Sequence, residues 1–369
     1  MVPGMAVPTS GFVPPFCPRS ECPSHAGTAP WRYTKAGFYF PRTSTSGIQR
    51  YNCGCCGASF SRQSFRVSYY LKRPDLLIPV FHRLLGCSGF RQIAREFGVS
   101  HTTVMRISER LGRHCLLWQW RHLRALRLRE PVAIDGFESF AHSQYYPCHL
   151  HVAAGASSHF FYAFTDSELR RKGRMTAAQK RRRRKLEEQH GRPDPKSIEK
   201  EIAELVRLLP STESGPLTIL SDEHPAYPRG LARTGRAVRH EVTPSTDPRT
   251  KVNPLFPVNL LDLLIRHCGG NHKRETIAFS KTRQNAVERL AIFQVFRNYM
   301  KSFSEKARDA TPAMRLGIAK RRLSAEEVLG KRLLVWKVGL PTRLEDYYRR
   351  RVKTGPRGVS RPHRLKLAD

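Results

Sequence analysis

Three aspartates stand at positions from which their carboxylates could act together. Asp135 closes the segment Val-Ala-Ile-Asp, Asp222 closes Thr-Ile-Leu-Ser-Asp, and Asp262 lies within Val-Asn-Leu-Leu-Asp-Leu-Leu-Ile. Carboxylates that converge can hold two divalent cations such as Mg²⁺ or Mn²⁺, and such a pair supports attack on a phosphodiester bond. A single aspartate after an apolar run is commonly a turn or capping residue, so the hypothesis depends on all three together.

The charge balance indicates which phosphodiester would be attacked. The chain has 65 Lys+Arg against 30 Asp+Glu and a formal net charge of +35, which favours a polyanionic partner such as nucleic acid. No window approaches the roughly 18 to 20 apolar residues of a membrane-spanning helix, and the proline-rich start is a poor secretory signal. Walker-type phosphate loops and Gly-x-Ser-x-Gly elbows are absent from the sequence. We therefore expect a soluble, intracellular protein that acts on nucleic acid.

Two cysteine pairs near the N-terminus have the spacing of a zinc ribbon. Four thiolates on two short turns satisfy tetrahedral Zn²⁺, and the metal then replaces a core too small to form alone. Cys55 is a spare thiol beside the second pair, and His25 could take the place of one cysteine of the first pair. The predicted ligands of this structural zinc are Cys17, Cys22, Cys53 and Cys56.

A helix-turn-helix pattern follows between residues 86 and 114. The segment 90–97 reads as a short helix, Gly98 permits the turn, and Ser100 is a typical cap for a second helix. An ordinary pair of core helices would look similar, but the ribbon and the net charge favour DNA binding. On that reading the residues that could face a major groove are Ser100, His101, Thr102, Thr103 and Arg106.

From Glu130 onward the pattern changes to short strands. The order of the candidate elements is that of a ribonuclease H-like domain: three strands, an inserted region, two further strands and then a helix. Asp135 would then lie on the first strand, Asp222 at the end of the fourth, and Asp262 on the helix after the fifth. The candidate elements are strands 132–135, 149–155, 160–165, 217–220 and about 237–242, with a helix at about 259–267.

The inserted region, residues 167–214, begins with a strongly basic segment. Such a run neutralises phosphates without reading bases, so it adds affinity and salt dependence but little specificity. The Ile and Leu residues between 198 and 209 predict a helix with a packing face. The predicted phosphate contacts of the basic segment are Lys180, Arg181, Arg182, Arg183 and Arg184.

The combination of zinc ribbon, helix-turn-helix and spaced acids resembles the transposases of bacterial insertion sequences that use an Asp-Asp-Glu or Asp-Asp-Asp triad. The segment 259–262, Asn-Leu-Leu-Asp, is similar to the Asn-x-x-Glu helix of such families, with Asp where Glu is commoner, and residues 274–281 resemble the basic stretch after it. The resemblance covers most of residues 17–305. It implies metal-dependent DNA cleavage and strand transfer, a homo-oligomer on DNA, element ends and target DNA as partners, no membrane, and a cytoplasmic, nucleoid-associated location.

The third acid has rivals. Glu288 and Glu275 are acidic residues downstream of Asp262, and Glu288 lies on a predicted amphipathic helix. Connection lengths within compact α/β units favour Asp262, because Glu288 falls a whole helix beyond the expected position. His224, Lys273 and Arg274 are further candidates for phosphate contact.

The resulting hypothesis is a multidomain transposase with an α/β ribonuclease H-like catalytic domain. The alternatives are a non-catalytic DNA-binding regulator that descends from a transposase, and a structure-specific nuclease without strand transfer. We expect a basic, irregular tail from Tyr347 onward. The predicted divisions are a flexible N-terminus (1–16), the zinc ribbon (17–66), the helix-turn-helix region (67–128), the catalytic domain (129–305) and a basic C-terminal region (306–369).

Overall fold

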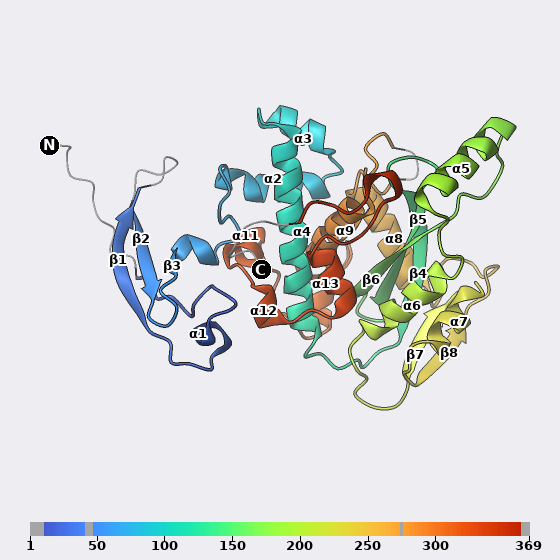
Figure 1. Cartoon of the computed structure of the whole chain (residues 1–369). Helices are drawn as coiled ribbons and strands as arrows, with labels where there is room; N and C mark the ends of the chain where they lie inside the picture. The colour runs from blue at the N-terminus through green and yellow to red at the C-terminus, as the bar shows by residue number, and fades with distance from the viewer. Residues whose placement is uncertain (1–10, 41–46, 274–275, 363–369) are drawn as a thin grey trace. The chain divides into compact units, whose positions relative to one another are not determined.

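The computed structural model of the chain describes residues 11–40, 47–273 and 276–362 (Figure 1). The chain divides into two compact units. Of the described residues, the first contains 11–40, 47–79 and 325–339, and the second contains 80–273, 276–324 and 340–362. The expected multidomain α/β class is confirmed, because the first unit contains a small antiparallel sheet and the second a mixed sheet with helices.

The first unit is built around a three-stranded antiparallel sheet of β1 (Tyr33–Tyr39), β2 (Ile48–Cys53) and β3 (Ser59–Ser61), preceded by the short helix α1 (Pro23–Ala26). Tyr51, Phe60 and Phe65 form its small aromatic core. A later segment of the chain returns to this unit through α11 (Ala325–Gly330) and α12 (Val335–Val338). There the Arg332 N–H donates to the Phe65 carbonyl at 2.8 Å, and Lys337 Nζ donates to the His25 carbonyl.

The second unit contains a five-stranded sheet in the order β6-β5-β4-β7-β8. β4 is antiparallel to β5 and parallel to β7, and β7 is parallel to β8. All five predicted strands are present, but the first is longer than expected, so Asp135 lies within it and not at its end. The strands are β4 (Val132–Phe140), β5 (Pro147–Gly155), β6 (Phe161–Glu168), β7 (Leu217–Ser221) and β8 (Val238–Val242).

Helices cover both faces of this sheet. On one face, Thr165 Oγ1 donates to the Glu201 carbonyl of α6 (Ser197–Arg207), which packs in turn on α7 (Ala226–Ala232). The opposite face carries Val152 and Phe164 and packs against α8 (Phe256–Cys268) and α9 (Arg283–Tyr299). Side chains alternate between faces along a strand, so Asp135, which pairs with Val152, belongs to the α8 side.

The helix-turn-helix pattern is present as α3 (Phe90–Glu96) and α4 (His101–Leu123), after α2 (Leu77–Leu85). Gly98 has φ +60°, and Ser100 Oγ accepts the Thr102 N–H as the predicted cap. α4 then continues along α9 in the same unit as the sheet. Gly112 permits this approach, since a Cβ there would stand 2.7 Å from Glu288 Cβ. The pattern is therefore built into the larger unit.

The C-terminal segment begins with short helices. After α10 (Pro312–Arg315), the helix α13 (Thr342–Tyr348) packs into the second unit, and Tyr347 is fully buried. The Tyr347 hydroxyl donates to the buried Asp166 carboxylate at 2.8 Å, and Arg283 and Arg343 also contact Asp166. The tail that follows is irregular, as expected, since the described residues 349–362 contain only the short 3₁₀ turn Gly355–Arg357. Its expected first two residues differ, because Tyr347 and Tyr348 end α13 and are buried.

The basic insertion forms a helix of its own, α5 (Ala177–His190), which extends past the sheet in Figure 1. Thr176 caps it by accepting the Gln179 N–H, and none of its residues is buried. In contrast, Ile202 and Leu205 of α6 are buried against the sheet, as the apolar spacing predicted. Short 3₁₀ turns occupy Arg62–Phe65, Pro74–Leu76 and Gly355–Arg357. Over the described residues, no helix is long and apolar enough to cross a membrane.

Candidate metal sites and nucleic-acid surfaces

The four predicted zinc ligands meet in the first unit. The sulfurs of Cys17, Cys22, Cys53 and Cys56 all lie within 4.8 Å of one another. Cys17 Sγ is 3.7 Å from Cys56 Sγ, and Cys22 Sγ is 3.8 Å from Cys53 Sγ. A tetrahedral ion with zinc–sulfur bonds of about 2.3 Å would separate its ligands by about 3.8 Å. The four thiols therefore have the spacing of a Cys₄ zinc site.

The two alternative ligands lie outside this group. The His25 ring is buried, with Nδ1 2.6 Å from the Cys17 carbonyl, so it supports the loop that carries the first pair. Burial lowers the pKa of His25, which favours its neutral form. Cys55 is exposed, and its N–H donates to Cys53 Sγ at 3.4 Å, as backbone amides do toward a thiolate ligand. Sequence spacing alone could not separate these roles.

The three aspartates come from β4, the end of β7 and α8. Asp222 directly follows β7, Asp135 lies on the neighbouring strand, and Asp262 lies on the helix that covers the same face as Asp135. The parallel pairing of Val132 with Ile219 brings the two strands together just before these acids. The fold thus gathers the three predicted acids in one part of the second unit.

Hydrogen bonds orient two of the three carboxylates. Asp135 Oδ1 accepts from the Tyr227 hydroxyl at 3.4 Å, and Asp222 Oδ1 accepts from the His224 N–H at 2.9 Å. The second contact is an ordinary turn bond, so Asp222 also fills the structural role that such residues commonly have. Asp262 differs, because its Oδ1 is buried and makes no hydrogen bond within the described chain.

The acids influence one another electrostatically. Burial raises the pKa of Asp135 to about 6, and the charge of Asp222 adds to that shift. Burial also raises the pKa of Asp262 well above its usual value, with a further contribution from Asp135, while Arg266 and Arg249 oppose it. Desolvated carboxylates that repel one another are stabilised by a cation between them.

The three carboxylates do not form a single tight cluster. Of the groups of three or more His, Cys, Asp or Glu residues within the described ranges, only the four cysteines have ligand atoms all within 4.8 Å of one another. A pair of ions about 3.5 to 4 Å apart requires ligands spread over a wider region than a single ion does. The aspartates are thus more widely spaced than ligands of one small ion.

Glu288, the rival third acid, belongs to a different environment. It is fully buried between α4 and α9, where Arg350 Nε donates to its Oε1 at 3.0 Å and Gln284 Nε2 donates to the same oxygen at 3.1 Å. Arg350 also pairs with Glu109 of α4 at 2.8 Å. Glu288 is therefore part of a buried ion-pair network. The other rival, Glu275, lies outside the described residues.

Two side chains near the acids were not singled out by sequence reasoning. Tyr227 is buried beside Asp135. Burial raises the pKa of Tyr227 well above its usual value, and the charges of all three aspartates raise it further. His149 lies over Gly136, where a Cβ would stand 2.5 Å from the imidazole Cε1. Burial lowers the pKa of His149 to about 4. The glycine after Asp135 was the available signal for His149, since a strand glycine often marks a close approach.

The predicted DNA contacts have unequal exposure. Ser100, His101 and Arg106 are exposed on α3–α4, whereas Thr102 and Thr103 are half-buried. On α5, Lys180, Arg181, Arg182 and Arg184 are exposed. Arg183 instead turns inward, where its Nη1 donates to the Arg171 carbonyl at 3.0 Å and its Nε lies 3.4 Å from Glu187. Lys273 and His224 are exposed, and Arg274 lies outside the described residues.

Comparisons with known proteins provide little further information. No family model matches the chain, and no curated protein matches it. One solved structure with similarity is described as the simian T-cell lymphotropic virus intasome in complex with PP2A regulatory subunit B56 gamma. The match has 14% sequence identity and a TM-score of 0.25, and it covers 67% of this chain and 74% of that chain. This score is too low to assign the fold, so a function has to be inferred from the residues themselves.

Proposed function

We propose that this protein is a DNA transposase whose catalytic domain has a ribonuclease H-like fold and uses Asp135, Asp222 and Asp262. The observation that carries the proposal is the buried Asp262 Oδ1, which makes no hydrogen bond within the described residues, together with the charge interactions that link Asp135 to Asp222 and to Asp262. An acceptor-only oxygen with no donor is costly unless a cation or water satisfies it. The strand order and the helix after β8 support the fold assignment.

The donor set fits hard divalent cations. Carboxylate oxygens are the ligands that Mg²⁺ and Mn²⁺ prefer, and the three aspartates would hold two such ions. When bound, the ions would supply Lewis-acid stabilisation of the scissile phosphate and a more acidic attacking water or hydroxyl. Tyr227 would orient Asp135, and the turn bond from His224 would orient Asp222.

The same centre would serve hydrolysis and transesterification. In hydrolysis, a water oxygen bonds to phosphorus while the bond from phosphorus to the 3′-oxygen breaks, which leaves a 3′-hydroxyl and a 5′-phosphate. In strand transfer, that 3′-hydroxyl attacks a target phosphodiester, so one phosphodiester replaces another. The pair α3–α4 would recognise element ends, and α5 would contact phosphates. We propose that the protein acts on DNA as a homo-oligomer, since two ends are joined.

The test is cleavage and strand transfer on duplexes that carry the DNA flanking the coding region, with Mg²⁺ or Mn²⁺. Asp135→Ala, Asp222→Ala and Asp262→Ala should each abolish product without weakening end binding. Glu138→Ala is the matched control, because Glu138 is exposed on the same strand and pairs with His149 on the opposite face from Asp135. Glu288→Ala is a poorer control, since it removes a buried ion-pair partner.

The outcomes separate the alternatives. Joined products that require all three aspartates support the transposase. Metal-dependent cutting without joined products would indicate a nuclease. Binding to the ends with no cutting by the wild-type protein would indicate a regulator.

A further inference from the structure

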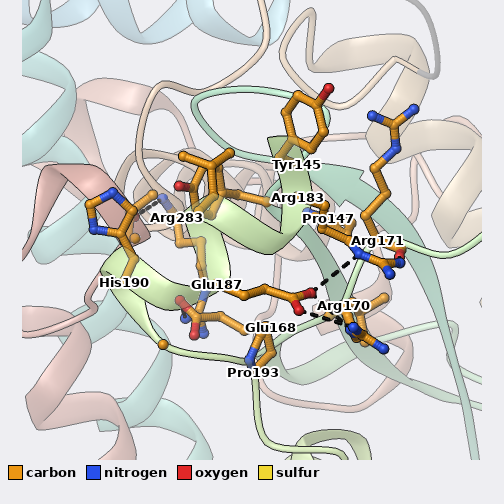
Figure 2. A pocket seen from close by; sticks show the side chains of 16 residues that line it. Tyr145, Pro147, Glu168, Arg170, Arg171, Arg183, Glu187, His190, Pro193 and Arg283 are labelled. Atoms are coloured by element: carbon orange, nitrogen blue, oxygen red, sulfur yellow. Dashed lines mark hydrogen bonds and ion pairs between the residues drawn. The ribbon is translucent and has the colours of Figure 1, made fainter. Parts of the chain in front are cut away.

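A pocket lies between the C-terminal half of α5 and the neighbouring ends of β5 and β6 (Figure 2). Its walls come from the turn before β5, the end of β6 and the residues after it, the last turns of α5 and the residues that follow, the first residue of α9, and residues 354–355. The lining includes none of the three aspartates and none of the four clustered cysteines. The side chains that matter here are Tyr145, Tyr146, Arg170, Arg171, Arg183 and Arg283.

The lining has more positive than negative charge. Its four arginines face two glutamates, Glu168 and Glu187. Arg170 pairs with Glu187 and donates to both carboxylate oxygens of Glu187, at 2.8 and 2.9 Å, as Figure 2 shows. Arg283 is likewise neutralised by Asp166 at 2.6 Å and Glu168 at 2.8 Å.

Two of the four guanidinium groups have no carboxylate of their own to balance their charge. Besides the Arg171 carbonyl, Arg183 contacts the Glu187 carboxylate, at 3.4 Å, and Arg170 already binds both oxygens of that carboxylate. Within the part of the chain that the structure describes, Arg171 has no carboxylate partner, and its guanidinium lies over the Tyr145 ring, 4.8 Å from the ring centroid. An anion in the pocket would therefore meet two cationic side chains.

Unsatisfied polar atoms in the lining support the same conclusion. Tyr146 Oη and Arg171 Nη1 are buried and make no hydrogen bond within the described residues, and the buried Arg183 Nε has only the ion-pair contact with Glu187 at 3.4 Å. Buried donors are rarely left without a partner unless a ligand, ion or water satisfies them. These three belong to different segments of the chain and line one pocket.

We propose that this pocket binds a phosphate group. A phosphate offers several acceptor oxygens in a compact tetrahedron, and guanidinium forks bind such anions strongly. The phenol of Tyr146 would add a neutral donor. The phosphate could belong to a DNA backbone or to a free phosphate compound. The proposed function favours DNA, because the exposed cations of α5, including Arg181 and Arg184, would bring a polyanion to the pocket.

The experiment measures binding of inorganic phosphate to the full chain by calorimetry, with ionic strength held constant by chloride. The test variants are Arg171→Gln and Tyr146→Phe, and the matched control is Arg174→Gln, which removes an exposed charge outside the pocket. We expect phosphate to bind the wild type and the control alike. Arg171→Gln should lose about tenfold or more in affinity, and Tyr146→Phe a few-fold, with unchanged melting in chloride alone.

A second arm identifies the source of the phosphate. The titration is repeated with the protein saturated by a short duplex. Exclusion of inorganic phosphate by DNA would support a backbone phosphate, and binding of both together would support a free phosphate compound. Failure of the duplex to bind would contradict the proposed function and leave the first arm intact. Absence of a pocket-dependent phosphate signal, or equal loss in Arg174→Gln, would overturn the inference.

Discussion

The Tyr227 hydroxyl donates to Asp135 Oδ1 at 3.4 Å, and Tyr227 lies on α7, the helix that follows Asp222. One short segment therefore carries the second acid and a side chain that orients the first. Replacing a side chain that orients a metal ligand commonly lowers metal affinity by about 10- to 100-fold. Tyr227 is accordingly a positioning residue for the proposed centre.

We expect Tyr227→Phe to raise the Mn²⁺ concentration for half-maximal cleavage by about tenfold, with a smaller effect on the rate at saturating metal. The measurement is cleavage rate against metal concentration. Tyr299→Phe is the matched control, since Tyr299 is buried and its hydroxyl makes no hydrogen bond within the described chain. An unchanged metal requirement in Tyr227→Phe would contradict the positioning role.

The raised pKa of Asp135 predicts a pH-dependent difference in stability. Its pKa rises from 3.8 to about 6 on folding, chiefly through burial, so the folded state holds this proton more tightly than the unfolded state. The corresponding stability is present below pH 3.8 and is lost as pH rises through about 6. Without added divalent metal, Asp135→Asn should therefore gain about 1 to 3 kcal/mol relative to wild type between pH 4 and pH 7. Denaturant unfolding across this range measures it, and a constant difference would exclude the effect.

The cysteine group predicts zinc dependence of the first unit. Purified protein should contain about one zinc ion per chain, and Cys53→Ser should lose it and become sensitive to proteolysis within residues 17–66. Cys55→Ser is the control, because Cys55 is exposed and outside the four-thiol group. Atomic absorption measures the zinc content of each variant. One zinc ion per chain in Cys53→Ser would show that another residue binds the metal.

The elements of the sheet were predictable from sequence, but their limits were not. Apolar runs marked β4 to β7, whereas β8 (Val-Arg-His-Glu-Val) is more polar. The Ser100 cap and Gly98 marked the turn before α4. The apolar run before Asp135 stops at Ile134, so the sequence predicted a strand that ends at Asp135. The strand nevertheless continues to Phe140, because every residue from Val132 to Phe140 pairs with β5. Strand length depends on the partner, which periodicity does not show.

Contacts between distant segments were also hidden from the sequence. Arg183 reads as one more cation in a basic run, yet Glu187 and the Arg171 carbonyl turn it inward. Residues 325–339 return to the first unit through backbone bonds such as Arg332 to Phe65, which leave no motif. The three aspartates could be proposed from sequence because their order along the predicted strands and helix matches that of a ribonuclease H-like domain. Tyr227 could not, since a lone tyrosine in a helix is most often a core residue.

The buried pair of Glu288 and Arg350 predicts a structural role for this acid. Burial raises the pKa of Glu288 to about 7, and the charge of Arg350 opposes that shift. Glu288→Ala should destabilise the protein by about 3 to 5 kcal/mol, because it leaves Arg350 buried with one partner fewer. Glu288→Gln should cost less than half of that, since it keeps the volume and a hydrogen-bonding oxygen. Denaturant unfolding compares the two, and a neutral Glu288→Ala would contradict the network.

The two proposed DNA-binding surfaces should respond differently to salt and to sequence. Replacement of Arg181, Arg182 and Arg184 by Gln should weaken binding to all duplexes alike, and it should reduce the slope of log K against log salt by about 0.9 for each phosphate that is no longer neutralised. Arg106→Ala should instead reduce the preference for element ends over unrelated DNA, and its slope should fall by at most about one. Fluorescence anisotropy at several salt concentrations measures both quantities. Arg121→Gln controls for net charge, because Arg121 is exposed near the opposite end of α4 from the proposed reading residues. If that control lowers the slope as much per residue as the α5 variants do, the effect belongs to the overall field of the protein and not to α5.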